Sequence, residues 1–582
     1  LGDPQNILFL SLHIPLMMLA ILFGISILIV VFVDIVYVLS LYLGVIGIII
    51  YKIVLAVIFL FSLFSVISKK QAVEYKSPVA KETIDIGDSI RKFYSRVIKL
   101  VKLERIKKLC EGLSRSKKEK IIVSLKFVLL YVLALLLFLF RVNLPPYIVF
   151  DEAHYVNAAR TLIKEHYDPR LEHPPLVKYM IALGILLLGD NPLGWRIPIV
   201  LVSTLAVPST YYIAKKITGS EKIAAIATIL LIFDPLFYEL SRLAMLDGPA
   251  LGLTTLAVAI LMKYTFEKEH DIRWLYISGL VFGLALSCKV QAIVPIFVAL
   301  LIAPVPRVKY RTIHFATALI LLPLAVLFMS YIPLYILSAM AEPISGNVIT
   351  RILTIQLLFR SIFPLWVLLI VNFMFTVYSR LPATQPEIES HPWEWFFGWK
   401  PIRGYVAFGA ALYAVVILLA NPVTWMLGLA ILITLNIVYS LVWLLENIFD
   451  RLDISGEIVG RIKNIKDSLS PMLYLLLWGI LIWLAYMPSA LAHWFYWYYQ
   501  PGTNKVLDWI GNIIWTLFKE GRPSYIFYMY HILPPMYIVL AIVLDRLDKI
   551  FKAPLSIFLT VSSIIYFMAI YPVISGAVWI RI

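Results

Sequence analysis

The sequence predicts an all-α polytopic membrane protein, and three observations support this fold class. Of the 582 residues, 61% are hydrophobic and only 15% are charged, whereas soluble domains carry about a quarter charged residues. The hydrophobic residues form blocks of roughly 17–25 residues, the length of helix that crosses a bilayer core. The chain lacks the segments of about ten alternating polar and apolar residues that a transmembrane barrel needs. We therefore expect a bundle of helices that span a bilayer.

Three regions follow one another along the chain. Residues 1–67 are almost continuously apolar and predict two, alternatively three, N-terminal spans. Residues 68–120 hold 16 Lys/Arg against 7 Asp/Glu, a large part of the formal net charge of +16. A basic stretch beside spanning helices predicts a cytoplasmic linker that can touch anionic lipid headgroups. Because no recognition module or aromatic platform accompanies the charge, nucleic acid is not expected as a partner.

Residues 121–582 form the main membrane domain, for which we expect about eleven spans. These lie near residues 121–140, 194–214, 223–238, 247–263, 274–288, 290–304, 313–335, 421–445, 471–490, 525–544 and 553–575. With the linker inside, the inward connections are rich in Lys or Arg, as the positive-inside rule requires. The outer loop 141–193 alternates apolar and charged residues at helical spacing, which predicts helices lying in the membrane interface.

Two polar motifs lie in this first outer loop. Asp151 and Glu152 are adjacent carboxylates that follow the span ending near residue 140. An Asp is also a common N-cap, and acids suit the positive end of a helix, so a capping role stays open. Near the end of the same loop, two prolines separate His173 from Lys178. They fix the backbone, and the alternative to a site is a rigid turn with a snorkelling lysine.

More ionisable residues occur at the outer ends of predicted spans. Arg196 opens one span, Arg242 and Asp247 flank a turn, and Lys289 lies at the junction of two spans. A charge at such a depth costs roughly 2.5–3.5 kcal/mol on insertion scales and usually marks a pathway or a site. Any one of them can be an interfacial anchor. Four from separate segments on the same side as Asp151 indicate a functional site.

The order of these motifs resembles the protein O-mannosyltransferases, a family of the GT-C class of membrane glycosyltransferases. The motifs are Phe150-Asp151-Glu152, His173-Pro174-Pro175-Leu176 with Lys178, Arg196, Ser241-Arg242 before Leu246-Asp247, Ser287-Cys288-Lys289, Pro392-Trp393-Glu394-Trp395, Asn421-Pro422-Val423 with Trp425, and Tyr530-His531-Ile532-Leu533-Pro534. The resemblance covers about residues 121–575 and implies a GT-C-type bundle. It departs from eukaryotic members because the segment 335–420 is too short for their inserted β-trefoil domain, which indicates a prokaryotic type.

The resemblance implies a reaction at the extracytoplasmic face of the cell membrane. A sugar, expected to be mannose, passes with inversion from a polyprenyl (dolichyl) monophosphate to a hydroxyl of protein Ser/Thr. A lipid or a lipid-linked glycan, as in the related aminoarabinose transferases, is the alternative acceptor. Tyr530 and His531 are implied as donor-binding residues.

The residues fit this chemistry in their own right. A hydroxyl acceptor needs a base, for which we expect Asp151, with Glu152 orienting the acceptor or supporting the loop. The departing phosphate needs cations, for which we expect Lys178, Arg196, Lys289 and His531, with His173 and Arg242 nearby. Asp247 is expected to hydrogen-bond the sugar or to pair with Arg242.

No cofactor or metal is expected, because the chain has no Asp-x-Asp and protein cations can neutralise a single phosphate. Two other classes of protein fit the sequence less well. A secondary transporter places its charges near the bilayer midplane and usually has repeated halves. Here the charges gather on one side, and no repeat is found. A non-catalytic scaffold has no need for converging carboxylates and cations.

Overall fold

The computed structural model describes residues 115–170, 173–266, 271–302, 309–341, 402–408, 411–418, 421–452, 454–497 and 526–575, with a few further positions between and after them. The chain divides into two compact units, Leu1–Lys118 and Glu119–Ile582. The account below concerns the second unit. The predicted N-terminal spans, the linker up to residue 114 and the Pro392–Trp395 motif lie outside the described residues.

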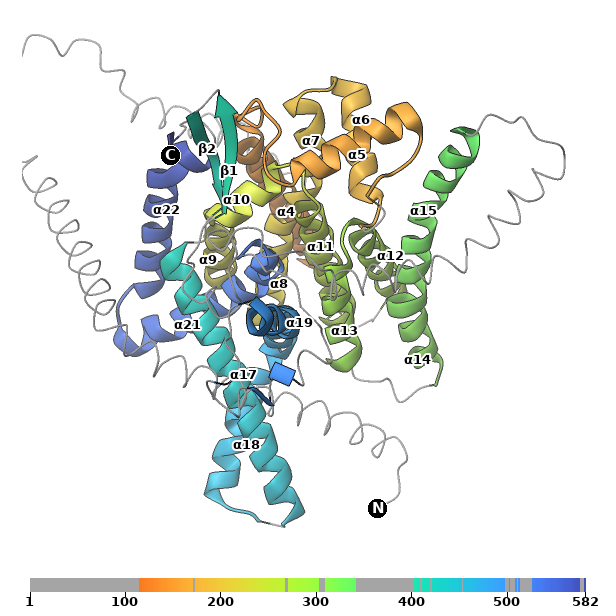
Figure 1. Ribbon diagram of the computed structural model, residues 1–582. Helices are drawn as coiled ribbons and strands as arrows, with labels where there is room; N and C mark the ends of the chain where they lie inside the picture. Colours follow the sequence, from red (N-terminus) through yellow and green to blue (C-terminus); the bar gives the residue numbers. More distant parts are fainter. Residues whose placement is uncertain are drawn as a thin grey trace, which may run out of the picture. The chain divides into compact units, whose positions relative to one another are not determined.

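Helices make up nearly all of the described chain (Figure 1). In order they are α4 (Arg115–Leu139), α5 (Glu152–Glu165), α6 (Leu176–Leu188), α7 (Pro192–Ser203), α8 (Ala206–Thr218), α9 (Glu221–Ile232), α10 (Pro235–Arg242), α11 (Asp247–Phe266), α12 (Ile272–Cys288), η1 (Val290–Ala292), α13 (Ile293–Ile302), α14 (Lys309–Ala316), η2 (Thr317–Leu321), α15 (Leu322–Ala341), α17 (Pro422–Arg451), α18 (Glu457–Leu469), η4 (Ser470–Met472), α19 (Leu473–Trp497), η5 (Ile526–Ile532), α21 (Leu533–Phe551) and α22 (Leu555–Ile574). The prediction of a helical membrane protein is confirmed.

Many of these helices are long and apolar enough to cross a membrane. Six meet that criterion among the described residues, or seven if the bent pair α9 and α10 forms one span. Four more of the eleven predicted spans fall on shorter apolar helices, namely Lys126–Leu139, Ile272–Cys288, Val290–Leu301 and Leu555–Tyr571. Large apolar side chains point outward, such as Leu187, which is 72% exposed, and Leu136, which is 64% exposed. An outward apolar surface of this kind suits lipid and not water.

The predicted span 223–238 is broken in the structure. Helices α9 and α10 meet at an angle of 62°. Asp234 accepts a hydrogen bond from the Phe237 backbone N–H at 2.8 Å, and Pro235 occupies the first turn of α10. An Asp N-cap followed by Pro begins a new helix, because Pro cannot donate to the preceding turn. The Asp-Pro pair was the sequence signal for this break.

Helix α11 lies at the centre of the bundle and packs against α7, α8 and α12. Its contact with α7 is close, because a Cβ on Gly252 would lie only 2.1 Å from the Val202 carbonyl oxygen. No larger residue fits there without moving the backbone. This contact holds the start of α11, which bears Asp247, beside α7, which bears Arg196.

Charged residues tie several helices together at one end of the bundle. Lys222 donates to Asp545 at 2.9 Å and to Asp548 at 2.7 Å, and Lys126 pairs with Glu221 at 2.9 Å. The turns after α8 and after α21, both predicted to face inward, therefore lie together. Helices α5 and α6 lie at the opposite end (Figure 1). We call the first end the basic end and the second the site end.

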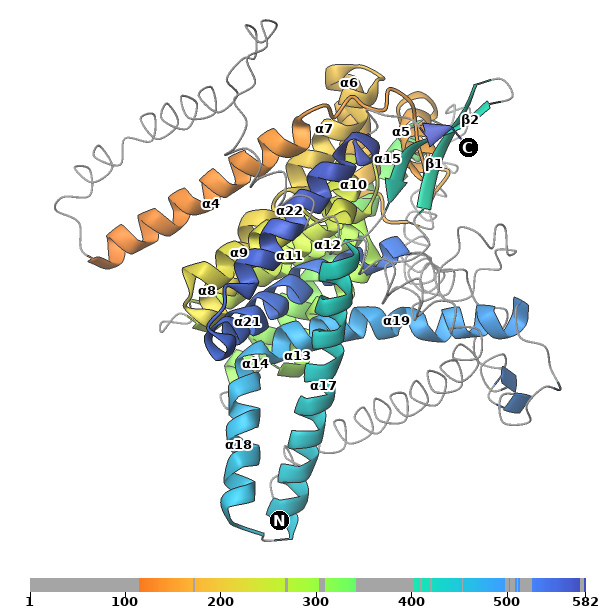
Figure 2. The same cartoon turned by 90° about the vertical axis from the view of Figure 1, so that its left-hand side faces the viewer.

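Two features extend this architecture beyond the sequence prediction. Helices α17 and α18 form a long hairpin, and α19 leaves it at an angle (Figure 2). A small antiparallel sheet joins β1 (Ile402–Phe408), β2 (Ala411–Leu418) and β3 (Ile580–Arg581) in that order. We expected only helices. Short apolar runs of seven or eight residues do not separate strand from helix by periodicity, which is why the sheet was missed.

Candidate active site

Asp151 lies in the turn that joins α4 to α5. Phe150 before it has a positive φ of 56°, which is uncommon for a bulky residue and typical of constrained functional turns. Asp151 itself is half-buried, and within the described chain its side chain makes no cap hydrogen bond to α5. The capping interpretation that the sequence left open is therefore not supported. Asp151 remains the candidate base.

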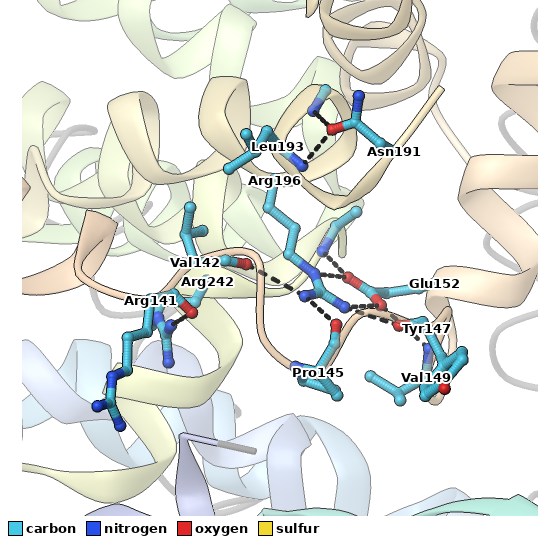
Figure 3. Close-up of polar contacts among 12 residues, drawn as sticks. Arg141, Val142, Pro145, Tyr147, Val149, Glu152, Asn191, Leu193, Arg196 and Arg242 are labelled. Carbon is cyan, nitrogen blue, oxygen red and sulfur yellow. Dashed lines mark hydrogen bonds and ion pairs between the residues drawn. The ribbon is translucent and has the colours of Figure 1, made fainter. Parts of the chain in front are cut away.

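A buried ion pair holds the first turn of α5 (Figure 3). Glu152 and Arg196 are both fully buried, and Nε and Nη2 of Arg196 each donate to one Glu152 carboxylate oxygen at 2.8 Å. The same carboxylate accepts the backbone N–H of Ala244 at 2.8 Å and that of Val149 at 3.1 Å. The remaining N–H groups of Arg196 donate to the carbonyl oxygens of Val142, Pro145 and Tyr147.

These contacts decide the roles of both residues. A guanidinium has five N–H donors, and all five of Arg196 are used inside the protein. Each N–H of Arg196 thus has a protein acceptor in this structure, and its expected role on the donor phosphate stays a prediction. The Glu152 carboxylate receives four hydrogen bonds, so it supports the loop, which is one of its two expected roles. Together they fix the residues on both sides of Asp151.

Arg242 holds the end of α4. It is buried, and it donates to the carbonyl oxygens of Phe138 at 3.0 Å, Phe140 at 3.1 Å and Arg141 at 2.6 Å. A cation suits the unpaired carbonyls at a helix C-terminus. The expected pairing of Arg242 with Asp247 is wrong, because Asp247 pairs with Lys289.

Lys178 is likewise used within the protein. Its ammonium group donates to the carbonyl oxygens of Arg170 at 2.6 Å and His173 at 2.9 Å, and it forms an ion pair with Asp168. The side chain is only 1% exposed. It therefore holds the loop before α6, and its expected role on the donor phosphate stays a prediction. The His173 ring lies against Tyr155, with ring centroids 5.8 Å apart.

Lys289 differs from the other predicted cations. It lies at the break between α12 and η1, where its backbone is extended, as expected for the junction of two spans. Its ammonium group is 2.6 Å from Asp247 Oδ1 and 5.8 Å from the centre of the Tyr528 ring. The side chain keeps 13% exposure, against 1% for Lys178 and 0% for Arg196. Of these three, Lys289 retains the best access for an anionic ligand.

Tyr530 and His531 lie in η5, just before α21. The Tyr530 hydroxyl is 2.7 Å from Ser241 Oγ, and its ring stacks on Phe237. His531 is fully buried, and neither ring nitrogen has a hydrogen-bond partner among the residues that the structure describes. A buried polar group without a partner is costly and calls for an explanation such as a ligand or a water.

The segment 241–247 brings the predicted residues together. Ser241 contacts Tyr530, Arg242 holds the end of α4, Ala244 donates to Glu152, and Asp247 pairs with Lys289. Sequence analysis singled out this segment for its charges. Its backbone N–H to Glu152 could not be foreseen, because that bond depends on how α10 and α11 fold back on α5.

Sequence analysis missed two other groups. Asp234 is fully buried and accepts hydrogen bonds from Trp425 Nε1 at 2.9 Å and from the Tyr537 hydroxyl at 2.6 Å. This joins α10 to α17 and α21. Asp190 binds Arg160 and Trp195 at the site end. Burial alone would raise the pKa of Asp190, but these two hydrogen bonds lower it below its ordinary value, so the carboxyl is ionised at neutral pH.

The described residues contain no group of three His, Cys, Asp or Glu side chains that could hold a metal ion. That the donor phosphate is bound without a metal nevertheless stays a prediction. Among the predicted donor-binding residues, Lys289 keeps 13% side-chain exposure, and both ring nitrogens of His531 lack a hydrogen-bond partner among the residues that the structure describes.

Comparison with known proteins now bears on this geometry. Residues 172–332 match the family described as dolichyl-phosphate-mannose-protein mannosyltransferase. A polyprenol-phosphate-mannose–protein mannosyltransferase of Corynebacterium glutamicum is 30% identical over 174 residues, which are 24% of this chain and 34% of the relative. Over these residues the chain is similar to the protein O-mannosyltransferases. The predicted resemblance to this family is therefore confirmed.

Other relatives of the same family extend the comparison. Dolichyl-phosphate-mannose–protein mannosyltransferase 3 of Saccharomyces cerevisiae is 24% identical over 237 residues, covering 37% of this chain and 30% of the yeast protein. The structure of the S. cerevisiae Pmt1–Pmt2 complex bound to the sugar donor has a TM-score of 0.53 at 12% identity, covering 78% of this chain and 90% of that one. The GT-C-type fold is thus confirmed. The sequence matches span only about a third of these relatives' length.

Proposed function

We propose that this protein is a membrane mannosyltransferase that moves mannose from a polyprenyl monophosphate to a Ser or Thr hydroxyl of a protein. One observation carries the proposal. The stretch that matches the mannosyltransferase family, residues 172–332, supplies Arg196 and Ala244, which bind Glu152 next to Asp151, and the pair of Asp247 and Lys289. The match therefore covers most of the residues that the sequence analysis predicted for the site.

The proposed reaction is a single displacement. Asp151 accepts the proton of the acceptor hydroxyl, whose oxygen forms a bond to the anomeric carbon. The bond from that carbon to the phosphate oxygen breaks, and the polyprenyl phosphate leaves with the electron pair. Attack opposite to the leaving group inverts the anomeric centre. Glu152 and Arg196 hold the Asp151 turn, so they position the base without touching the substrate.

Lys289 neutralises the charge that grows on the departing phosphate. Asp247, which holds its ammonium group at 2.6 Å, keeps Lys289 in place. His531 is assigned to a hydroxyl of the sugar, because a buried imidazole without a carboxylate partner is neutral. A neutral imidazole has one N–H donor and one acceptor nitrogen, which suits a hydroxyl better than a phosphate.

A transfer assay tests the proposal. Purified protein is given radiolabelled polyprenyl-phosphate mannose together with a membrane-protein fraction, and label is measured in protein, lipid and glycan fractions. We expect alkali-labile label in protein. Label in a lipid or a lipid-linked glycan would show that the acceptor is not a protein, while the proposed transferase activity would stand. If no fraction acquires label while the donor binds, the transferase proposal is wrong.

The site end is proposed to face the extracytoplasmic side. Single cysteines at exposed positions of the site end, such as Asn143 and Tyr167, are expected to react with an impermeant reagent added to intact cells. Residues 380–400 should react as well. Cysteines in the linker 68–120 or at Lys463 of α18 should react only after lysis. Labelling of the linker from outside would put the site in the cytoplasm.

Lys289 is expected to control the use of the donor. Lys289→Gln leaves Asp247 unpaired, so the double variant Lys289→Gln with Asp247→Asn is measured beside it. Both should raise the KM for the donor by about 10- to 100-fold, the effect of losing a hydrogen bond to a charged group. EDTA should leave turnover unchanged. If EDTA abolishes activity while both variants keep a normal KM, the donor phosphate is bound by a metal ion and not by Lys289.

A further inference from the structure

Arg160 lies on α5, two turns after Asp151, and contacts the turn between α6 and α7. Its guanidinium binds the Asp190 carboxylate in a bidentate manner, with Nε 2.9 Å from Oδ2 and Nη2 3.0 Å from Oδ1. Trp195 Nε1 donates to the same carboxylate at 2.7 Å, and the Arg160 guanidinium lies 5.3 Å from the centre of the Trp195 ring. Asn157 accepts a further hydrogen bond from Arg160 Nη1 at 3.0 Å.

The segment 189–196 that receives Arg160 is rigid. Gly189 has a φ of +85°, which suits a residue without a Cβ, and the Asn191 side chain caps α7 while donating to the Leu188 carbonyl oxygen. A Cβ on Gly194 would lie 2.1 Å from the Gly189 carbonyl oxygen. The chain is therefore packed against itself here. We call residues 189–196 the platform.

Two side-chain attachments of α5 end on this platform. At the start of the helix, Glu152 binds Arg196, and further along Arg160 binds Asp190 and Trp195. The first attachment is fully buried, while the second keeps side-chain exposures of 30% for Arg160 and 44% for Asp190. The first attachment holds the start of the helix, and the second holds it about two turns further along.

From this geometry we infer that Arg160 and Asp190 are positioning residues for the reaction, and that they fix the orientation of α5 and with it the carboxylate of Asp151. The inference rests on the proposed role of Asp151 as base. An isolated exposed ion pair contributes little to stability. The bidentate geometry and the contact with Trp195 restrict the relative orientation of Arg160 and Asp190. Its effect is therefore expected on catalysis and not on folding.

The test compares Arg160→Gln, Asp190→Asn and their double variant with the wild type. Each single variant should lower kcat by about 10- to 100-fold, since a displacement of about 1 Å of a catalytic group can cost 100-fold. The KM for the donor should stay within about twofold of wild type, since Lys289 lies elsewhere. The double variant should lose no more than the worse single variant, because both remove one contact. Additive losses would overturn the inference.

A matched control exists at the start of α12. Arg273 binds Asp271 in a similar bidentate manner, with Nε 3.0 Å from Oδ1 and Nη2 2.8 Å from Oδ2. This pair is also exposed, and it lies outside the site. Arg273→Gln should therefore leave kcat unchanged. An equal loss of kcat in Arg273→Gln would show that the effect is not specific to α5, and the inference would fail.

Amide hydrogen exchange separates this inference from the proposed function. In Arg160→Gln, the amides of Glu152–Glu165 should exchange about tenfold or more faster, while those of α11 keep their protection. Unchanged exchange in α5 would overturn the inference whatever the activity. Faster exchange with wild-type kcat would also overturn it. If the wild-type protein transfers no mannose, the proposed function fails, and the exchange result alone decides whether Arg160 holds α5.

Discussion

Asp151→Asn is expected to lower turnover by at least about 100-fold, within the range usual for acid–base catalysis. The amide keeps the size of the side chain but cannot accept the proton of the acceptor hydroxyl. Because Asp151 makes no cap bond to α5 in the described structure, the substitution should not unfold the helix. The measurement is kcat in the transfer assay together with the thermal unfolding temperature.

Asp271→Asn is the control for this result. Asp271 does cap its helix, because it accepts the backbone N–H of Arg273 at 3.1 Å, and it lies outside the site. Its variant should keep normal turnover. Asp151→Asn with turnover near that of the wild type would exclude Asp151 as the base. The other carboxylate of the turn, Glu152, could not replace it, because all four of its hydrogen bonds come from protein groups.

Arg196→Gln is expected to have the largest effect on folding. It leaves the Glu152 carboxylate buried without its cation, and breaking a buried pair in this way costs about 3–5 kcal/mol. It also releases the carbonyl oxygens of Val142, Pro145 and Tyr147, so the loop before Asp151 detaches. We expect a much lower unfolding temperature and little recovered protein.

The double variant Glu152→Gln with Arg196→Met separates folding from catalysis. It removes both buried charges, so part of the stability should return. Turnover should not return, because the loop stays detached from α7. The exposed pair Lys126–Glu221 provides the control, and Lys126→Gln should cost less than about 1 kcal/mol. If Arg196→Lys keeps normal stability and only raises the KM for the donor, Arg196 binds the donor phosphate.

Sequence analysis predicted the helical class correctly, and it placed Lys289 at the junction of two helices. It did not predict the partners of the cations. Arg196 and Lys178 were expected on the donor phosphate, with Arg242 nearby. In the structure they donate to carbonyl oxygens at the end of α4 and in the loops before α5 and α6. Loops near a membrane have backbone groups that water does not satisfy, and long cations fill that need.

The sequence by itself determined that this chain forms helices in a bilayer, because a spanning helix is predicted from the length and hydrophobicity of one continuous block of residues. It also held the local signal for one break, Asp234-Pro235, although residues 223–238 were predicted as a single span. Only the tertiary structure decided which charged side chains bind other groups of the protein. The distance from Arg196 to Glu152, 44 positions earlier in the chain, depends on how α5 folds onto α7. A hydrogen bond requires that distance to be correct within a few tenths of an ångström. No pattern along the sequence predicts the distance between two separate segments so closely.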